Sequence, residues 1–245
     1  MFSIIPSEDT HTATLIDITP DAEESIVYQA RVSNPSNQHN TQTSAKLIRY
    51  LINHKHWSPF EMAHMTVEVK TTRSVAAQIL RHRSFSFQEF SQRYASPTTL
   101  VLPQLRKRGS SNRQSSVPFE DELKEQALIK RVETHLNASA DLYSLLTAGG
   151  VANECAREIL PLATHTTLYM SGSIRSWIHY CQVRATPETQ AEHRRIAEEV
   201  KGILKEKLPN TYEAAFPTPL PVPPCPKPST LSRFYSFLAL LPRFS

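Results

Sequence analysis

A dense run of polar and basic side chains at residues 81–93 is the part of the sequence best suited to chemistry. It reads Arg-His-Arg-Ser-Phe-Ser-Phe-Gln-Glu-Phe-Ser-Gln-Arg, with basic groups at Arg81, His82, Arg83 and Arg93. Guanidinium groups bind oxyanions through paired N–H donors, so this run suits a ligand rich in phosphate and carbonyl oxygens. A simpler interpretation is a solvated helix end, where cations meet the negative pole of the helix dipole. Further matches along the chain favour the ligand site.

The overall composition indicates a soluble globular protein that binds an anionic partner. The chain has 245 residues, 40% hydrophobic and 20% charged, with a net charge of +4. This length is enough for one large domain or two small ones with a real core. The positive charge fits an anionic small molecule or nucleic acid without deciding between them. No apolar run approaches the roughly 20 residues of a membrane span, and residues 1–13 lack a signal-peptide pattern, so we expect no membrane association.

The cysteine and glycine patterns exclude several classes of protein. Cys155, Cys181 and Cys225 form neither a CxxC pair nor an even-numbered disulfide framework, which predicts a reducing, cytoplasmic location. Cys155 and Cys181 fall within helical patterns and are predicted to be small core residues. The chain has only five glycines and no G-x-G-x-x-G run, which argues against an ordinary NAD dehydrogenase.

Hydrophobic periodicity predicts the elements that position residues 81–93, which we call the signature. Before and around it we expect short strands and amphipathic helices: strands at 13–18, 26–32 and 65–69, and helices at 43–54 and 75–83. The second of these helices is predicted to be capped by Ser74. The signature would then begin at the end of that helix and continue into a loop that grips the ligand.

After the signature the pattern predicts a polar surface loop followed by mostly helical structure. The loop is expected at 105–117, the strand at 164–169, and helices at 118–148, 153–160, 174–183 and from Pro187 onward. Seven prolines fall within residues 216–228, where the composition changes. We therefore predict a catalytic domain at 1–215 and a tail at 216–245 that is not part of the core.

Three different motifs with fixed residue spacing lie within residues 26–215. The first is Arg-His-Arg, seven residues, then Ser-x-Arg at 81–93. The second is His-Trp-Ser-Pro-Phe-Glu at 56–61, and the third is Glu-x-Ala-Arg-x-x-Leu-Pro at 154–161. Together they resemble the signature, the H-x-[ST]-P-F-E box and the second block of flavin-dependent thymidylate synthases. A chance match to so many fixed positions is much less probable than a match to one short motif.

The resemblance implies a fold, an assembly and a reaction. The fold would be α/β (α+β), a single catalytic domain with a central, mostly antiparallel sheet flanked by helices. The protein would form a homotetramer with active sites at subunit interfaces. It would methylate dUMP to dTMP with methylenetetrahydrofolate as carbon donor, FAD as carrier and hydride source, and NADPH as reductant. No metal and no protein nucleophile are implied.

The resemblance also implies roles for individual residues. Those expected to bind FAD are Ser58, Glu61, Arg81, His82, Arg83, Glu89, Ser173, Ile174, Arg175 and His179. Those expected to bind dUMP are Gln78, Arg81, Glu89, Phe90, Ser91, Gln92, Arg93, Arg157 and Arg184. Arg184 is the implied catalytic residue, since a fixed cation near N3 of the uracil ring stabilises developing negative charge.

Three departures from the family pattern and two alternative functions accompany this interpretation. Met62 stands where a histidine is frequent and cannot donate a hydrogen bond, whereas Ser173 and His179 replace common asparagines and keep that capacity. One alternative is a nucleic-acid-binding protein that uses the basic signature on phosphates, although the acids Glu61 and Glu89 within the candidate site argue against it. The other is an inactive flavin-binding homologue.

Overall fold

The fold is organised around two long paired strands, β3 (His64–Thr72) and β8 (His165–Ser173). In the computed structural model, which describes residues 2–110 and 115–217, they pair antiparallel over their full length. Strand β2 (Thr12–Ile18) joins the free edge of β3, and β4 (Ser86–Glu89) joins the free edge of β8. The resulting sheet has the order β2-β3-β8-β4, with every neighbouring pair antiparallel.

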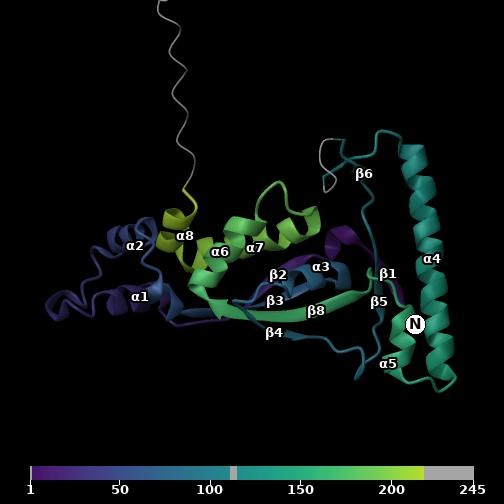
Figure 1. The fold of residues 1–245 in the computed structure, drawn as a ribbon, viewed down its shortest axis with the longest axis horizontal. Helices are drawn as coiled ribbons and strands as arrows, with labels where there is room; N and C mark the ends of the chain where they lie inside the picture. The colour runs from purple at the N-terminus through teal and green to yellow at the C-terminus, as the bar shows by residue number, and fades with distance from the viewer. Residues whose placement is uncertain (1, 111–114, 218–245) are drawn as a thin grey trace, which may run out of the picture.

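One face of this sheet is covered by helices. Along β3 the buried side chains of Met65, Val67 and Val69 alternate with Glu68 and Lys70, which are less buried. This period of two places apolar groups on one face only. Helices α3 (Arg73–Ile79), α6 (Ile174–Arg184) and α7 (Ala191–Lys207) lie over that face (Figure 1). The sheet is therefore a platform on which these helices rest.

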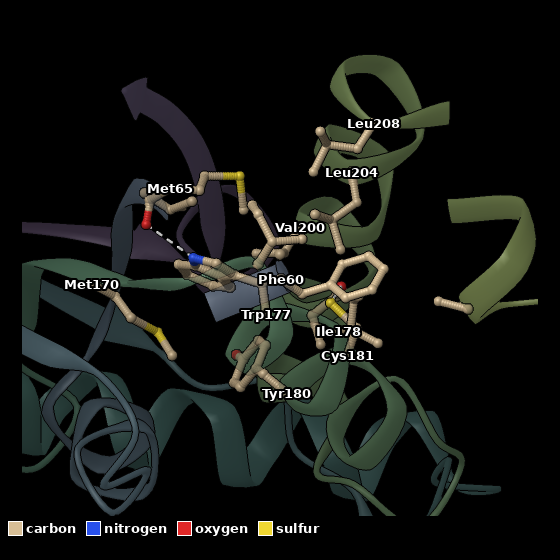
Figure 2. Packing of buried hydrophobic residues seen from close by; sticks show 14 of the residues in the cluster. Phe60, Met65, Met170, Trp177, Ile178, Tyr180, Cys181, Val200, Leu204 and Leu208 are labelled. Carbon is tan, nitrogen blue, oxygen red and sulfur yellow. Dashed lines mark hydrogen bonds between the residues drawn. The ribbon is translucent and has the colours of Figure 1, made fainter. Parts of the chain in front are cut away.

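The core between sheet and helices is centred on Trp177 of α6. Its indole is fully buried, and its Nε1–H donates to the Met65 carbonyl oxygen of β3 at 2.9 Å (Figure 2). Val200 and Leu204 of α7 pack into the same cluster. This hydrogen bond between a helix side chain and a strand backbone fixes where α6 lies on the sheet.

The remaining elements lie at the two ends of the sheet (Figure 1). At one end are α1 (Ala22–Ala30), α2 (Ser44–Asn53), the 3-10 turns η2 (Pro35–Asn37) and η3 (Ser58–Glu61), and α8 (Pro209–Ala215). At the other end are the parallel strands β1 (Ser3–Pro6) and β5 (Thr99–Leu102), the 3-10 turns η1 (Ser7–Asp9) and η4 (Arg157–Ile159), and helices α4 (Glu122–Ala148) and α5 (Asn153–Ala156). A small second core of Leu100, Leu136 and Ala140 holds α4 against β5.

The expected α/β fold class is confirmed, and so are most of the predicted elements. The strand expected at 26–32 is wrong, because residues 26–30 belong to α1, where Ala22 and Ile26 are buried at helical spacing, and residues 31–32 form the turn after it. The helix expected at 75–83 begins and ends earlier, as α3, and its N-cap is Thr72 rather than Ser74. The long helix expected from residue 118 begins at Glu122, because the Asp121 carboxylate caps it by accepting from the Lys124 N–H at 3.0 Å.

Three other expectations need correction. The signature is not one continuous loop, since its middle part, Ser86–Glu89, forms β4 at the sheet edge, and only residues 90–93 return to a loop. The segment at 105–117 contains a two-stranded hairpin, β6 (Lys107–Arg108) and β7 (Ser116–Val117), within its described residues. Cys155 is exposed, whereas Cys181 is buried as expected. The helix that contains Cys155 ends at Ala156, and it turns this side chain to solvent while burying Ala156.

The predicted tail at 216–245 lies outside the described residues from position 218 onward, and so does Cys225. Within the part of the chain that the structure describes, no helix is long and apolar enough to cross a membrane.

A matched pair of leucine substitutions tests the assignment of the core. Leu168→Ala removes a fully buried side chain from β8 and should lower the free energy of unfolding by about 2–5 kcal/mol, because a cavity is left behind. Leu123→Ala removes an 81% exposed side chain on α4 and should change it by less than about 0.5 kcal/mol. Urea unfolding at one fixed protein concentration measures both. Equal effects would contradict the assignment of β8 to the core.

Candidate active site

The signature is held in place by packing on β8 and α6. The Phe85 ring meets the Trp177 indole edge-on, with ring centroids 4.7 Å apart. Phe85 also lies against Gly172 of β8, where an added Cβ would come within 2.5 Å of the ring. Because β4 then pairs with β8, both ends of the turn that carries Arg81 and His82 are anchored.

A cavity of about 610 Å³ opens where the end of α3 approaches the end of α6. We call it the α3–α6 cavity. Its lining residues are Gln78, Arg81, Val183, Arg184, Thr186, Glu188, Thr189 and Gln190. Among the described residues, neither the Arg81 nor the Arg184 guanidinium is paired with a carboxylate. With Glu188 as the acid in this lining, the two guanidinium groups leave a net positive charge for an anionic or electron-rich ligand.

Arg184 is held by a neutral histidine. Its Nε–H donates to His82 Nε2 at 3.0 Å, so the proton of His82 must be on Nδ1. Burial, together with the charge of Arg184, lowers the pKa of His82 to about 4. His193 lies beside it, with ring centroids 6.3 Å apart, and burial lowers its pKa to about 3. Near neutral pH, Arg184 is therefore the charged member of this group of three.

A second cavity, of about 330 Å³, lies on the other side of α6. We call it the α6–η3 cavity. Its lining residues are Trp57, Glu61, Ser84, Arg175, Ser176, Ile178, His179 and Gln182. The Glu61 carboxylate accepts from Ser173 Oγ at 2.5 Å and from Arg175 Nη1 at 2.7 Å. The Ser173 hydrogen bond, with Arg175, holds the pKa of Glu61 below its usual range, so this acid remains ionised and fixes Arg175.

The remaining expected nucleotide residues form a third group beyond β4. Glu89 accepts from Thr166 Oγ1 at 2.9 Å and pairs with Arg73 at 2.8 Å. The same Arg73 donates to the Phe90 carbonyl oxygen. Ser91 follows, with its hydroxyl accepting from a backbone N–H at 3.4 Å, and Gln92 is buried.

Two arginines complete this third group. Arg93 pairs with Glu154 of α5 at 3.0 Å, and Arg157 lies within 3.7 Å of Glu158. Neither lines the α3–α6 or the α6–η3 cavity. In one chain, the expected FAD and dUMP residues are thus divided mainly between two cavities and this third group.

Outside the third group, five expected residues line neither cavity. Two of them, His82 and Ser173, are hydrogen-bonded to the lining residues Arg184 and Glu61. The other three lie farther away. Ser58 is exposed at the start of η3, and Arg83 is exposed in the turn after α3. The Ile174 side chain is fully buried in the main core. Met62, the departure from the family pattern, is 58% exposed and lines neither cavity.

Sequence reasoning missed His193 and Glu192, which lie behind the α3–α6 cavity. His193 Nδ1 is 3.4 Å from Gln78 Oε1, and its ring contacts that of His82. Helical spacing carries a weak signal for it, since His193, Ile196 and Val200 share the buried face of α7. Nothing in the local sequence indicates that this histidine would meet the signature.

Comparison with known proteins agrees with this geometry. A family model described as "Thymidylate synthase complementing protein" matches residues 14–210. The chain is 48% identical over 204 residues to a probable flavin-dependent thymidylate synthase of Paramecium bursaria Chlorella virus 1, covering 83% of this chain and 94% of that protein. It is 44% identical over 206 residues to the flavin-dependent thymidylate synthase of Synechocystis sp., covering 84% and 95%.

A solved structure shares the fold. The UMP/dUMP methylase PolB from Streptomyces cacaoi, bound with 5-Br dUMP, superposes with a TM-score of 0.76 at 26% identity, covering 87% of this chain and 96% of that one. An α/β fold with two cavities on either side of one helix, together with these matches, defines a methyltransferase of thymidylate synthesis. The chain belongs to the flavin-dependent thymidylate synthase family, as the sequence blocks predicted.

The buried histidines predict how stability depends on pH. The folded-state pKa values of His82 and His193 lie below the unfolded value of about 6.5, so the unfolded chain takes up protons that the folded chain does not. This contribution to stability is present above about pH 6.5 and is lost as the pH falls toward 4 and then 3. The free energy of unfolding should therefore fall between pH 7 and pH 4.5.

Urea unfolding at a series of pH values measures this effect. His193→Asn should make the decline shallower, because it removes one of the histidines whose pKa is lowered by burial. His135→Asn, at an exposed position on α4, is the matched control and should keep the wild-type decline. An unchanged slope in His193→Asn would contradict burial of a neutral imidazole at this position.

Proposed function

We propose that the chain converts dUMP to dTMP by reductive methylation. Methylenetetrahydrofolate is the carbon donor, FAD the bound carrier and hydride source, and NADPH the reductant. Residues 1–215 form the catalytic domain, which acts in the cytoplasm as a homotetramer. This proposal extends the family assignment to a particular cofactor, donor, reductant and assembly.

The observation that best supports the proposal is the position of the Arg184 guanidinium and its lack of a carboxylate partner among the described residues. This guanidinium is free of carboxylate partners among the described residues, lines the α3–α6 cavity, and is oriented by the neutral His82 ring. Ionisation or polarisation of a uracil ring near N3 places negative charge on the adjacent ring carbonyl oxygens and makes C5 a better nucleophile. A fixed cation against those oxygens stabilises that charge without reorganising during the reaction. Arg184 therefore supplies the electrostatic part of catalysis.

The residues around α6 fit a flavin dinucleotide. Arg81 and Arg83 are exposed and unpaired among the described residues, as a pyrophosphate requires. Arg175 and His179 line the α6–η3 cavity with Trp57, which gives a polar edge and an aromatic wall. When bound, FAD supplies one-carbon carriage and hydride donation, which no side chain can provide. The chain's own part is to hold and orient both ligands.

The division of the site within one chain supports an assembly with composite active sites. If the expected residues bind one nucleotide, it must contact both Arg184, over the sheet, and the third group with Arg93 and Arg157, beside α5. No hydrogen bond or ion pair among the described residues joins these two groups. Near α5, Leu145 and Leu162 are each 69% exposed, which offers apolar surface for a second subunit. A neighbouring copy can therefore complete the site.

Substituting Arg184 tests its role. Arg184→Ala should lower kcat for dTMP formation at least about 100-fold while the flavin absorbance of the purified protein is retained, since the proposed FAD ligands are other residues. Arg49→Ala removes an exposed cation on α2 and should keep full activity. If Arg184→Ala lost FAD as well, its assignment to the nucleotide would be wrong. Wild-type protein that binds FAD and dUMP yet forms no dTMP would instead identify an inactive homologue.

Mixing two inactive variants tests the composite site. Arg184→Ala and Arg157→Ala should each be inactive, yet co-expression should restore up to roughly a quarter of the wild-type activity, because random assembly creates sites with both residues intact. Co-expression of Arg184→Ala with Arg81→Ala is the control. These two residues line one cavity of one chain, so every site keeps a defect. Equal recovery in both mixtures, or none in either, would contradict a site shared between subunits in this way.

A further inference from the structure

A chain of hydrogen bonds runs from the start of α7 into the α3–α6 cavity. Gln78 Nε2 donates to Gln190 Oε1 at 2.7 Å, and Gln190 Nε2 donates to Glu192 Oε2 at 2.9 Å. The same carboxylate accepts from Arg106 Nη2, at 2.7 Å to Oε1 and 2.8 Å to Oε2. Gln78 and Gln190 line the cavity, whereas Glu192 and Arg106 do not. The charged pair therefore reaches the cavity only through the two amides.

The ionised state of Glu192 sets the direction of this chain. Burial raises the pKa of Glu192, but its own backbone N–H, the Gln190 amide and Arg106 outweigh burial and hold the pKa below its usual value. An ionised carboxylate can only accept hydrogen bonds. Gln190 must therefore turn its NH₂ toward Glu192 and its carbonyl oxygen toward Gln78.

Gln78 is constrained in turn. With the Gln190 carbonyl oxygen facing it, Gln78 presents its NH₂ on that side and its own carbonyl oxygen on the His193 side, 3.4 Å from Nδ1. Because the His193 ring is buried and neutral, it can donate from Nδ1 to that oxygen without bringing a charge. One amide orientation thus pairs each donor with an acceptor from Arg106 to Nδ1 of His193, and the flipped orientation would set like donors or like acceptors against each other.

We propose that Glu192 and Arg106 are positioning residues for the nucleotide, which fix the amide orientation of Gln78 and Gln190 in the α3–α6 cavity. This inference rests on the proposed function, in which dUMP occupies that cavity. A ligand with fixed acceptor and donor positions binds best to amides that need not reorient. Loss of the Glu192 charge lets both amides flip, so part of the population presents the wrong group to the ligand.

A simpler role for Glu192 is stabilisation of α7, since it lies in the first turn of that helix, where negative charge is favourable. Such a role would affect folding and leave the coupling to Gln78 unaffected. A double-mutant cycle separates the two roles, because residues that act through one another have non-additive effects on binding.

The experiment measures dUMP binding to the FAD-loaded protein by isothermal titration calorimetry. Glu192→Gln keeps the shape of the side chain and removes its charge, and it should weaken dUMP binding about tenfold. Gln78→Ala should weaken it by a similar factor. In the double variant, the second substitution should weaken dUMP binding by less than about a further twofold. Glu198→Gln, an exposed acid on the same helix, is the matched control and should bind dUMP as the wild type does.

Each outcome decides between the roles. Additive effects of Glu192→Gln and Gln78→Ala, or unchanged binding in Glu192→Gln, would overturn the positioning role while leaving the proposed function intact. Arg106→Gln should weaken dUMP binding as Glu192→Gln does, and its effect should likewise be non-additive with that of Gln78→Ala. A Glu192→Asp variant keeps the charge and should bind dUMP more tightly than Glu192→Gln. Wild-type protein that binds no dUMP would overturn the proposed function and this inference together, and the wild-type titration reveals that case before any variant is made.

Discussion

The position of α6 on the sheet is the constraint on which the rest of the structure depends. The Trp177 indole is locked by its hydrogen bond to the Met65 carbonyl oxygen of β3 and by the rings of Phe85 and Tyr180 around it. The backbone N–H of Ile174 donates to the Ala63 carbonyl oxygen at 2.9 Å and ties the start of the helix to the residue just before that strand. Two attachments separated by one turn remove the freedom of the helix to slide or rotate.

With that rotation fixed, one helix serves two cavities. Arg175 and His179, four residues apart, share a face and line the α6–η3 cavity. Trp177 and Cys181, also four apart, face the core. Arg184, in the last turn, reaches the α3–α6 cavity. Because an α-helix has 3.6 residues per turn, burying one face of α6 fixes the positions of the residues that line each cavity. A shift of α6 would therefore disturb both cavities together.

The sequence predicted features that depend on neighbouring residues better than contacts between residues far apart in the chain. Periodicity correctly identified strands and helices whose burial repeats locally, such as β3 and α6. The family resemblance predicted that Gln78, Arg81 and Arg184 bind the nucleotide, and the structure places all three in the lining of one cavity. Periodicity failed at α1, where two adjacent β-branched residues suggested a strand although burial recurs at helical spacing. It also could not pair Arg106 with Glu192, 86 residues away, because a charged side chain carries no local signal of its partner.

Burial of two histidines gives the α3–α6 cavity a charge that hardly changes with pH. Both His82 and His193 lose their protons well below neutral pH because desolvation disfavours the imidazolium and the nearby Arg184 repels it. The guanidinium itself stays protonated throughout the range in which a protein is folded. Neutral imidazoles can then accept and donate hydrogen bonds that orient Arg184 and Gln78 without competing for the ligand's negative charge. The fold brings His82, His193 and Arg184 together, and burial leaves Arg184 as the charged member of these three.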